Sequence, residues 1–188
     1  MLQNDWVPLD LLDERQIRAF ERAFYRAFSR SKGNLLVRKL WIWNDEEGRL
    51  KTRIPYSAQK IFVSWDESGE VDTAVAFNCS SDYFQAGFFG FERPLCYDSA
   101  YEVLAFYSRC DQKFRELRHF MWHCALYCDR QGVPWIDATC TDRLLRAYQR
   151  VGGVLQSTVV INGEARHHLR FSIPAFIQAH QSFAQVGP

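Results

Sequence analysis

The chain has 188 residues, of which 47 % are hydrophobic and 24 % charged, and its 23 basic and 22 acidic side chains leave a formal charge of +1. This composition is globular rather than disordered, and the length fits a single domain over residues 1–188. The near-neutral charge gives no bulk attraction to nucleic acid, and no run approaches the ~20 apolar residues of a membrane helix.

Apolar spacing in the first half of the chain predicts one helix followed by strands. A helix over residues 13–29 is indicated by apolar side chains at helical spacing, which are Ile17, Phe20, Phe24 and Phe28. Residues 35–43 are apolar with interspersed bases and predict a strand. Residues 59–65 and 71–78 flank a short turn that contains Gly69, so they predict a hairpin.

Strands alternate with helices in the second half. The predicted elements are a strand at 102–108, a helix at 111–130, a strand at 133–139, a helix at 142–151, and strands at 154–161 and 165–173. The last two strands meet at Asn162–Gly163, a strong hairpin signal, and a short helix and loose tail follow. This order predicts a single-domain α/β fold, with a mixed, mostly antiparallel central sheet flanked by helices. Residues 13–173 form its core and residues 174–188 its tail.

The segment from Leu144 to Gly153 reads Leu-Leu-Arg-Ala-Tyr-Gln-Arg-Val-Gly-Gly. Together with the order of elements from Glu102 to Ile173, it resembles the GNAT superfamily of N-acetyltransferases. The signature of that superfamily in this region is A-x-x-x-Y-x-x-x-G-F. Tyr148 falls where that family has its tyrosine general acid, and Gly153 stands in place of the usual Phe. The resemblance implies an N-acyltransferase that moves an acyl group from a thioester to a small-molecule amine, with Tyr148 protonating the leaving sulfur.

The same resemblance assigns the acyl donor to the start of the long helix. In that family the helix N-terminus holds the pyrophosphate of coenzyme A beside a glycine-containing loop, whereas residues 109–116 contain no glycine. The residues expected to seat the phosphate of acyl-CoA or acyl-phosphopantetheine are Arg109, Gln112, Lys113, Phe114 and Arg115. A solvated basic face explains the same charges equally well.

Within the superfamily, the acyl-homoserine-lactone and N-acyl-amino-acid synthase-like branch is similar in fold and uses long acyl chains, often from an acyl carrier protein. That branch often carries a glutamate on the strand before the long helix. Glu102 lies on the corresponding strand and is our candidate base, with a salt-bridged structural residue as the alternative. An acidic acyl carrier protein could dock on a helix face formed by Arg143, Arg146 and Arg150, although such a face is usually only solvated.

The run from Tyr83 to Phe91 holds five aromatic residues and two glycines in nine positions. It predicts either an apolar site for an acyl chain or packing in the core. The side chains expected to line the acyl site are Phe84, Phe88, Phe89 and Phe91.

The six cysteines are spaced irregularly, without a CxxC pair or a secretion signal, so we expect reduced thiols in a cytoplasmic protein. His119 with His123, and Cys124 with Cys128, form i,i+4 pairs on different faces of the predicted helix, so no metal is expected. Two hypotheses therefore remain. The first is an N-acyltransferase that uses acyl-CoA or an acyl carrier protein, and the second is a non-catalytic GNAT-fold module that binds an acyl group or a partner protein.

Overall fold

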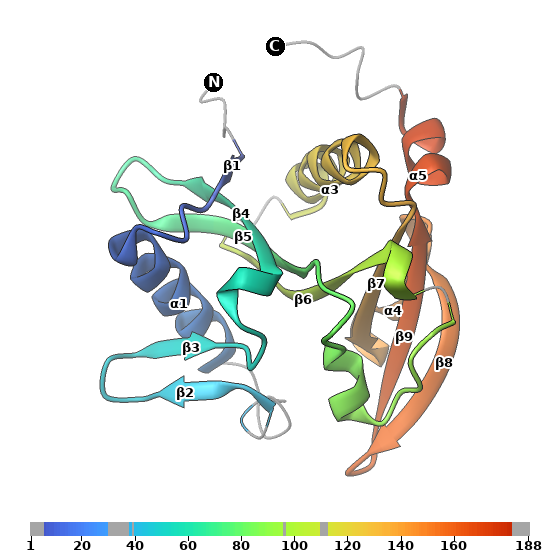
Figure 1. Ribbon diagram of the computed structural model, residues 1–188, viewed down its shortest axis with the longest axis horizontal. Helices are drawn as coiled ribbons and strands as arrows, with labels where there is room; N and C mark the ends of the chain where they lie inside the picture. Colours follow the sequence, from blue (N-terminus) through green and yellow to red (C-terminus); the bar gives the residue numbers. More distant parts are fainter. Residues whose placement is uncertain (1–5, 30–37, 39, 96, 110–112, 182–188) are drawn as a thin grey trace. The chain divides into compact units, whose positions relative to one another are not determined.

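The computed structural model describes residues 6–29, 38, 40–95, 97–109 and 113–181, except for the side chains of residues 113–120 (Figure 1). The chain divides into two compact units. Unit 1 comprises Met1–Phe77 and Leu104–Asp111, and unit 2 comprises Asn78–Val103 and Gln112–Pro188. One strand, β6 (Ala100–Ser108), contributes residues to both units.

Unit 1 contains the predicted amphipathic helix, α1 (Glu14–Ser29). Its first turn is capped by Asp13, whose Oδ1 accepts a hydrogen bond from the backbone N–H of Arg15 at 2.9 Å. Phe20 and Phe24 are buried on the predicted face, as is Ile17. The helix is therefore held by burial of one apolar stripe, as the sequence indicated.

The strands of unit 1 are short at its beginning and longer afterwards. They are β1 (Val7–Pro8), β2 (Ile42–Asn44), β3 (Arg49–Lys51), β4 (Gln59–Trp65) and β5 (Val71–Asn78), with a 3-10 turn at Tyr56–Ala58. The strands predicted at 59–65 and 71–78 are confirmed. The strand predicted at 35–43 is confirmed only at Ile42 and Trp43 and is wrong at the other residues of this range that the structure describes. Arg38 and Leu40 are helical, and the strand that forms begins at Ile42, where it can pair with β3 across the turn at 45–48.

Unit 2 contains most of the predicted second half. Its elements are 3-10 turns η2 (Gln85–Phe89) and η3 (Tyr97–Ser99), helices α3 (Lys113–Arg130), α4 (Asp142–Arg150) and α5 (Ile173–Ala179), and strands β7 (Trp135–Thr141), β8 (Val154–Ile161) and β9 (Glu164–Ser172). Each predicted strand and helix from residue 102 to residue 173 is confirmed, with bounds shifted by no more than two residues where they are described. No described helix is both long enough and apolar enough to cross a bilayer.

The strands form a seven-stranded sheet in the order β1-β4-β5-β6-β7-β9-β8. β6 and β7 are parallel and pair only over Ala100–Glu102 and Trp135–Asp137. β7 pairs with β9, and β9 with β8, in antiparallel register. The predicted mixed, mostly antiparallel sheet flanked by helices is therefore confirmed.

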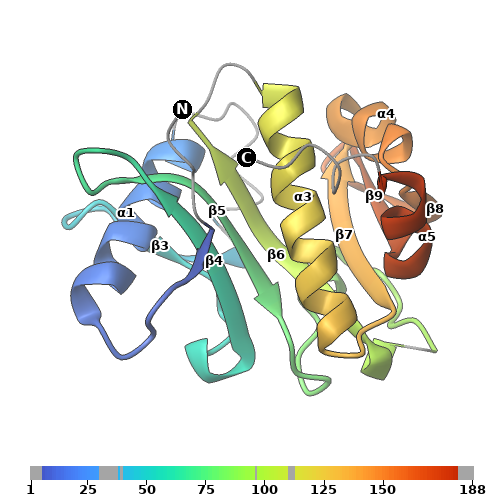
Figure 2. The ribbon, with the colours of Figure 1, turned by 90° about the horizontal axis from the view of Figure 1, so that it is seen from above.

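The sheet of unit 2 presents two different faces, because successive side chains of a strand point to opposite sides. On one face, Phe171 of β9 contacts Tyr148 of α4, and His167 binds Asp142. Figure 2 shows α3 beside β7 and the helices α4 and α5 beside β9. The opposite face carries Glu102 and His168, and the segment 84–91 packs against it. We call this second face the polar face.

Candidate active site

A buried carboxylate lies at the centre of the polar face. Glu102 of β6 is 2 % exposed. Its Oε1 accepts a hydrogen bond from the backbone N–H of Ala86 at 2.7 Å, and its Oε2 accepts one from the N–H of Gln85 at 2.8 Å. The Tyr97 hydroxyl donates a third bond to Oε2 at 2.9 Å. Glu102 therefore ties the turn η2 to the sheet.

The surroundings of Glu102 have two opposing effects on its pKa. Burial raises its pKa, while the hydrogen bonds from Gln85, Ala86 and Tyr97 oppose that rise. Burial and the neighbouring Glu102 carboxylate also raise the pKa of Tyr97. Glu102 forms no ion pair with any residue that the structure describes. Its structural contacts are hydrogen bonds, not the salt bridge expected in the alternative.

A second carboxylate, Asp137, is the register neighbour of Glu102 on the adjacent strand. It is 1 % exposed and binds Arg170 in a two-point contact, with Nε to Oδ1 at 2.9 Å and Nη2 to Oδ2 at 2.7 Å. Burial acts to raise the pKa of Asp137, but the hydrogen bonds from Arg170 and His168 outweigh it, and the pKa lies below its usual value. The two neighbouring carboxyl groups are thus shifted in opposite directions, a pattern typical of acid–base sites.

His168 completes this buried group. Its Nε2 lies 3.2 Å from Asp137 Oδ1, and its ring contacts Phe84 and Phe91. Because an ionised carboxylate only accepts hydrogen bonds, Nε2 carries a proton in this contact, and Nδ1 is the ring nitrogen that points away from Asp137. An imidazole oriented in this way by a carboxylate can accept a proton at its other nitrogen.

Sequence reasoning missed Asp137, His168 and Arg170 as a group. A signal was present, because Asp137 interrupts the apolar strand 133–139, and Arg166, His168 and Arg170 alternate along the last strand. Polar side chains at every second position of a strand lie on one face of it. Such a face is either exposed to solvent or part of a buried polar site. The sequence does not determine the strand register that brings Asp137 next to His168 and Arg170, which lie 31 and 33 positions away along the chain.

Tyr148, the predicted general acid, lies on α4 and packs against β9. Its ring is 6.0 Å from that of Phe171, at an interplanar angle of 64°. Its hydroxyl has no hydrogen-bond partner among the described residues. Burial raises the pKa of Tyr148 to about 12, so the phenol is protonated at neutral pH. Val151, which directly follows this helix, is buried, whereas Leu144 of the helix is 44 % exposed.

The residues predicted to seat the donor phosphate belong to both units. Arg109 belongs to unit 1, where its Nη1 lies 2.9 Å from Asp66 Oδ2 and 3.3 Å from Glu70 Oε2. Lys113, Phe114 and Arg115 occupy the first turn of α3, and their side chains lie outside the described part of the chain. Gln112 lies wholly outside it. The helix thus begins where the sequence predicted, while Arg109 is paired with carboxylates elsewhere.

The four phenylalanines predicted to line an acyl site lie at different depths. Phe89 and Phe91 are buried, Phe84 is half-buried against Tyr97, and Phe88 is 55 % exposed. Phe84 and Phe91 enclose His168 rather than lining one continuous apolar wall. The segment therefore covers the polar face.

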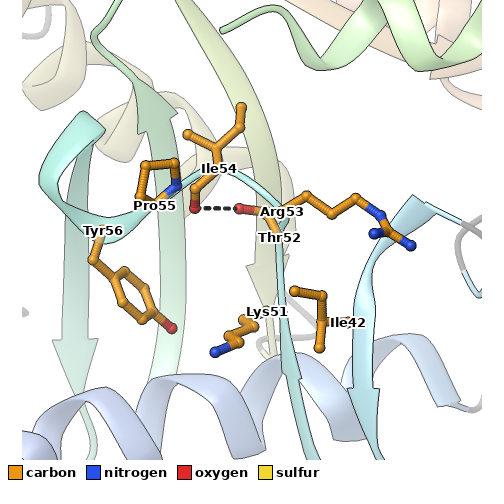
Figure 3. A pocket seen from close by; sticks show the side chains of 7 residues that line it. All are labelled: Ile42, Lys51, Thr52, Arg53, Ile54, Pro55 and Tyr56. Atoms are coloured by element: carbon orange, nitrogen blue, oxygen red, sulfur yellow. Dashed lines mark hydrogen bonds between the residues drawn. The ribbon is translucent and has the colours of Figure 1, made fainter.

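Unit 1 has a small pocket of its own, with a volume of about 120 Å³ (Figure 3). It is lined by Ile42, Lys51, Thr52, Arg53, Ile54, Pro55 and Tyr56. Thr52 Oγ1 donates to the carbonyl of Ile54 at 3.4 Å, and Gln59 Nε2 donates to both. Ligand pockets usually measure about 300–1,000 Å³, so this one is too small for a coenzyme.

Comparisons with known proteins identify the architecture. No family model matches the chain, and no curated protein matches it. Among solved structures, it is similar to TofI in a ternary complex with an inhibitor and MTA, at 15 % identity and a TM-score of 0.67 over 92 % of both chains. It is also similar to the acyl-homoserine lactone synthase LasI, at 14 % identity and a TM-score of 0.67 over 90 % of this chain and 88 % of LasI.

A broader relative gives the same architecture. Mutant forms of the spermidine/spermine N-acetyltransferase SpeG from Vibrio cholerae share 12 % identity, with a TM-score of 0.55 over 94 % of this chain and 98 % of SpeG. The fold is the GNAT fold. The resemblance inferred from residues 102–173 is thus confirmed at the level of architecture, with TM-scores of 0.67 for TofI and LasI and 0.55 for SpeG. The GNAT fold alone does not assign chemistry to its side chains.

Proposed function

We propose that the chain is an N-acyltransferase that moves an acyl group from an acyl thioester to an amine. The observation that carries this proposal is Tyr148, a protonated phenol with no hydrogen-bond partner among the described residues, at the signature position of a GNAT fold. The similar structures support it, since they include a CoA-dependent acyl-homoserine lactone synthase and a spermidine/spermine N-acetyltransferase.

The chemistry balances with the groups available. The amine nitrogen attacks the thioester carbonyl carbon, a C–N bond forms, and the C–S bond breaks. The departing thiolate takes the phenolic proton of Tyr148, and the amine gives its proton to a base. General acid–base catalysis by one such group typically contributes about 10²–10⁴-fold.

Glu102 and His168 are the two candidates for the base. Glu102 already accepts three hydrogen bonds, so it would take up a proton either by giving up one of them or through a water molecule. His168 has its Nδ1 lone pair available when Asp137 holds the proton on Nε2. The two are distinguishable, because Glu102→Gln releases the turn η2, whereas His168→Asn leaves Glu102 and its donors in place.

The donor is either acyl-CoA or an acyl carrier protein. Arg143, Arg146 and Arg150 are exposed on α4, and none forms an ion pair with a described residue, so they can meet an acidic carrier protein. The start of α3 is the proposed phosphate seat for either donor. The proposed acyl site remains the segment with Phe84, Phe88, Phe89 and Phe91, of which Phe88 is the most exposed.

The alternative function is a non-catalytic GNAT-fold module that binds an acyl group or a partner protein. The absence of glycine from residues 109–116 favours it, because glycines let a helix N-terminus approach a pyrophosphate closely. The two functions differ in turnover. Thiol release from short- and long-chain acyl-CoAs and from acyl carrier protein, measured against a panel of amines, separates them.

Tyr148→Phe tests the proposal directly. The ring contact with Phe171 is retained, so the variant should fold normally and bind the donor with little change in Kd, while turnover falls by roughly 10²–10⁴-fold. Tyr83→Phe is the matched control, because Tyr83 is an exposed tyrosine of the same unit, and it should keep wild-type turnover. Wild-type turnover in Tyr148→Phe would remove Tyr148 from the mechanism. Donor binding without thiol release in the wild type would favour the alternative function.

A further inference from the structure

Two arginines on the same face of β9 have opposite environments. Arg170 is bound at two points by Asp137. Arg166, four residues earlier and therefore on the same face, forms no ion pair or hydrogen bond with any described residue. Its Nε is enclosed by protein and has no hydrogen-bond partner. Because both arginines lie on β9, the difference between the paired Arg170 and the unpaired Arg166 does not arise from a difference in secondary structure.

The guanidinium of Arg166 is nevertheless held in a fixed place. Its Cζ lies 4.3 Å from the centroid of the Phe89 ring, and Phe89 is itself buried in the segment that covers the polar face. Stacking on an aromatic ring fixes the plane of the guanidinium and reduces the conformational entropy that a bound ligand would have to remove. Arg166 as a whole is only half-buried, and of its three guanidinium nitrogens only Nε is both enclosed and unpaired.

A half-buried cation without a counter-charge is costly unless something pairs with it. Burial already lowers the pKa of Arg166, although it remains charged at neutral pH. The nearest acidic neighbour along its own strand face is Glu164, which is exposed and forms no ion pair with it. The guanidinium of Arg166 therefore offers hydrogen-bond donors in a fixed position, and no described residue supplies an acceptor for them.

We infer that Arg166, stacked on Phe89, is the binding site for the oxyanion group of a ligand. A carboxylate or a phosphate fits the fork of Nη1 and Nη2 in a two-point contact, as Asp137 fits Arg170. The carboxylate of an acceptor amine and the phosphate of a donor are the two sources of such a group. This inference can be tested independently of the proposed acyl transfer, because anion binding is measured without turnover.

The experiment is calorimetric titration of the full chain with sodium phosphate and, separately, with sodium acetate at constant ionic strength. Arg166→Gln should weaken binding by about 10- to 100-fold, the loss expected for charged hydrogen bonds. Arg166→Lys keeps the charge but not the fork and should be intermediate. Arg130→Gln removes an exposed arginine of the same unit, to which we assign no binding role, and should bind like the wild type.

The outcomes separate clearly. Binding of phosphate alone indicates a donor phosphate, binding of acetate alone indicates a carboxylate, and binding of both indicates a general oxyanion site. Equal binding by Arg166→Gln and the wild type overturns the inference. An equal loss of binding in Arg130→Gln also overturns it, because only net charge would then matter. Unfolding of each variant without anions is measured in parallel. Arg166→Gln should be at least as stable as the wild type, because it removes an unpaired charge.

Discussion

Replacing Glu102 by Gln tests whether the buried carboxylate holds the turn η2. Glutamine keeps the shape of the side chain but converts one acceptor oxygen into an NH2 donor. If that group replaces Oε1, it faces the backbone N–H of Ala86, and if it replaces Oε2, it faces the N–H of Gln85. Either orientation leaves one buried backbone donor without an acceptor.

The magnitude follows from these contacts. One orphaned buried donor costs about 1–3 kcal/mol, and the surviving hydrogen bonds weaken by about 1 kcal/mol because the acceptor loses its charge. Removing the buried charge offsets part of this loss, since burial disfavours the ionised carboxyl. We therefore expect Glu102→Gln to lower the free energy of unfolding by about 1–3 kcal/mol. In a chain of this length, that lowers Tm by roughly 2–12 °C.

The assay is urea and thermal unfolding, together with hydrogen exchange at the amides of Gln85 and Ala86. Glu92→Gln is the control, because it makes the same chemical change at an exposed glutamate of the neighbouring segment. It should leave the unfolding midpoint within experimental error. An unchanged midpoint and unchanged amide protection in Glu102→Gln would show that the turn is held by something other than this carboxylate.

Three further predictions concern stability and thiol reactivity. Asp137→Asn should cost about 3–5 kcal/mol at pH 7, because Arg170 loses its buried partner. Since the pKa of Asp137 lies below 3.8 in the folded chain, its contribution is present above that pH and lost in acid, so wild-type stability should fall on acidification more steeply than that of Asp137→Asn in urea titrations. Gly153→Ala should lower the free energy of unfolding by about 1–3 kcal/mol, measured by urea denaturation, because the added Cβ would meet Phe171 Cζ at 2.8 Å. Burial raises the pKa of Cys128 to about 12, and it also raises that of Cys124, so both should resist DTNB at pH 8 until the protein is unfolded.

The second half of the fold was predictable because its signals are local. Asn162–Gly163 fixes the last hairpin, with Asn162 at φ 53° and Gly163 at φ 82°, values that suit these two residue types. Gly132 follows α3 at φ 69°, in the left-handed conformation that commonly ends a helix and that glycine adopts without strain. The strand predicted at 35–43 begins too early, because the prediction rested on a short apolar run, where period alone does not separate helix from strand.

The candidate site was less predictable, since it depends on contacts between distant residues. Glu102 was identified from its place on the strand, but its three donors come from residues 85, 86 and 97 in irregular backbone. The group of Asp137, His168 and Arg170 requires the register between β7 and β9. Arg109 illustrates the reverse case. Its position near the helix start indicated a phosphate ligand, while its partners, Asp66 and Glu70, belong to a turn about forty residues away.

Gly153 shows how a departure from a sequence signature can be compensated in three dimensions. The resemblance places a phenylalanine at this position, but a Cβ there would lie 2.8 Å from Phe171 Cζ and 2.9 Å from the carbonyl oxygen of Tyr148. The space beside the glycine is thus already occupied by Phe171 from β9. That same ring contacts Tyr148 at 6.0 Å. The glycine at 153 therefore leaves room for Phe171, and Phe171 in turn packs against the proposed acid, Tyr148.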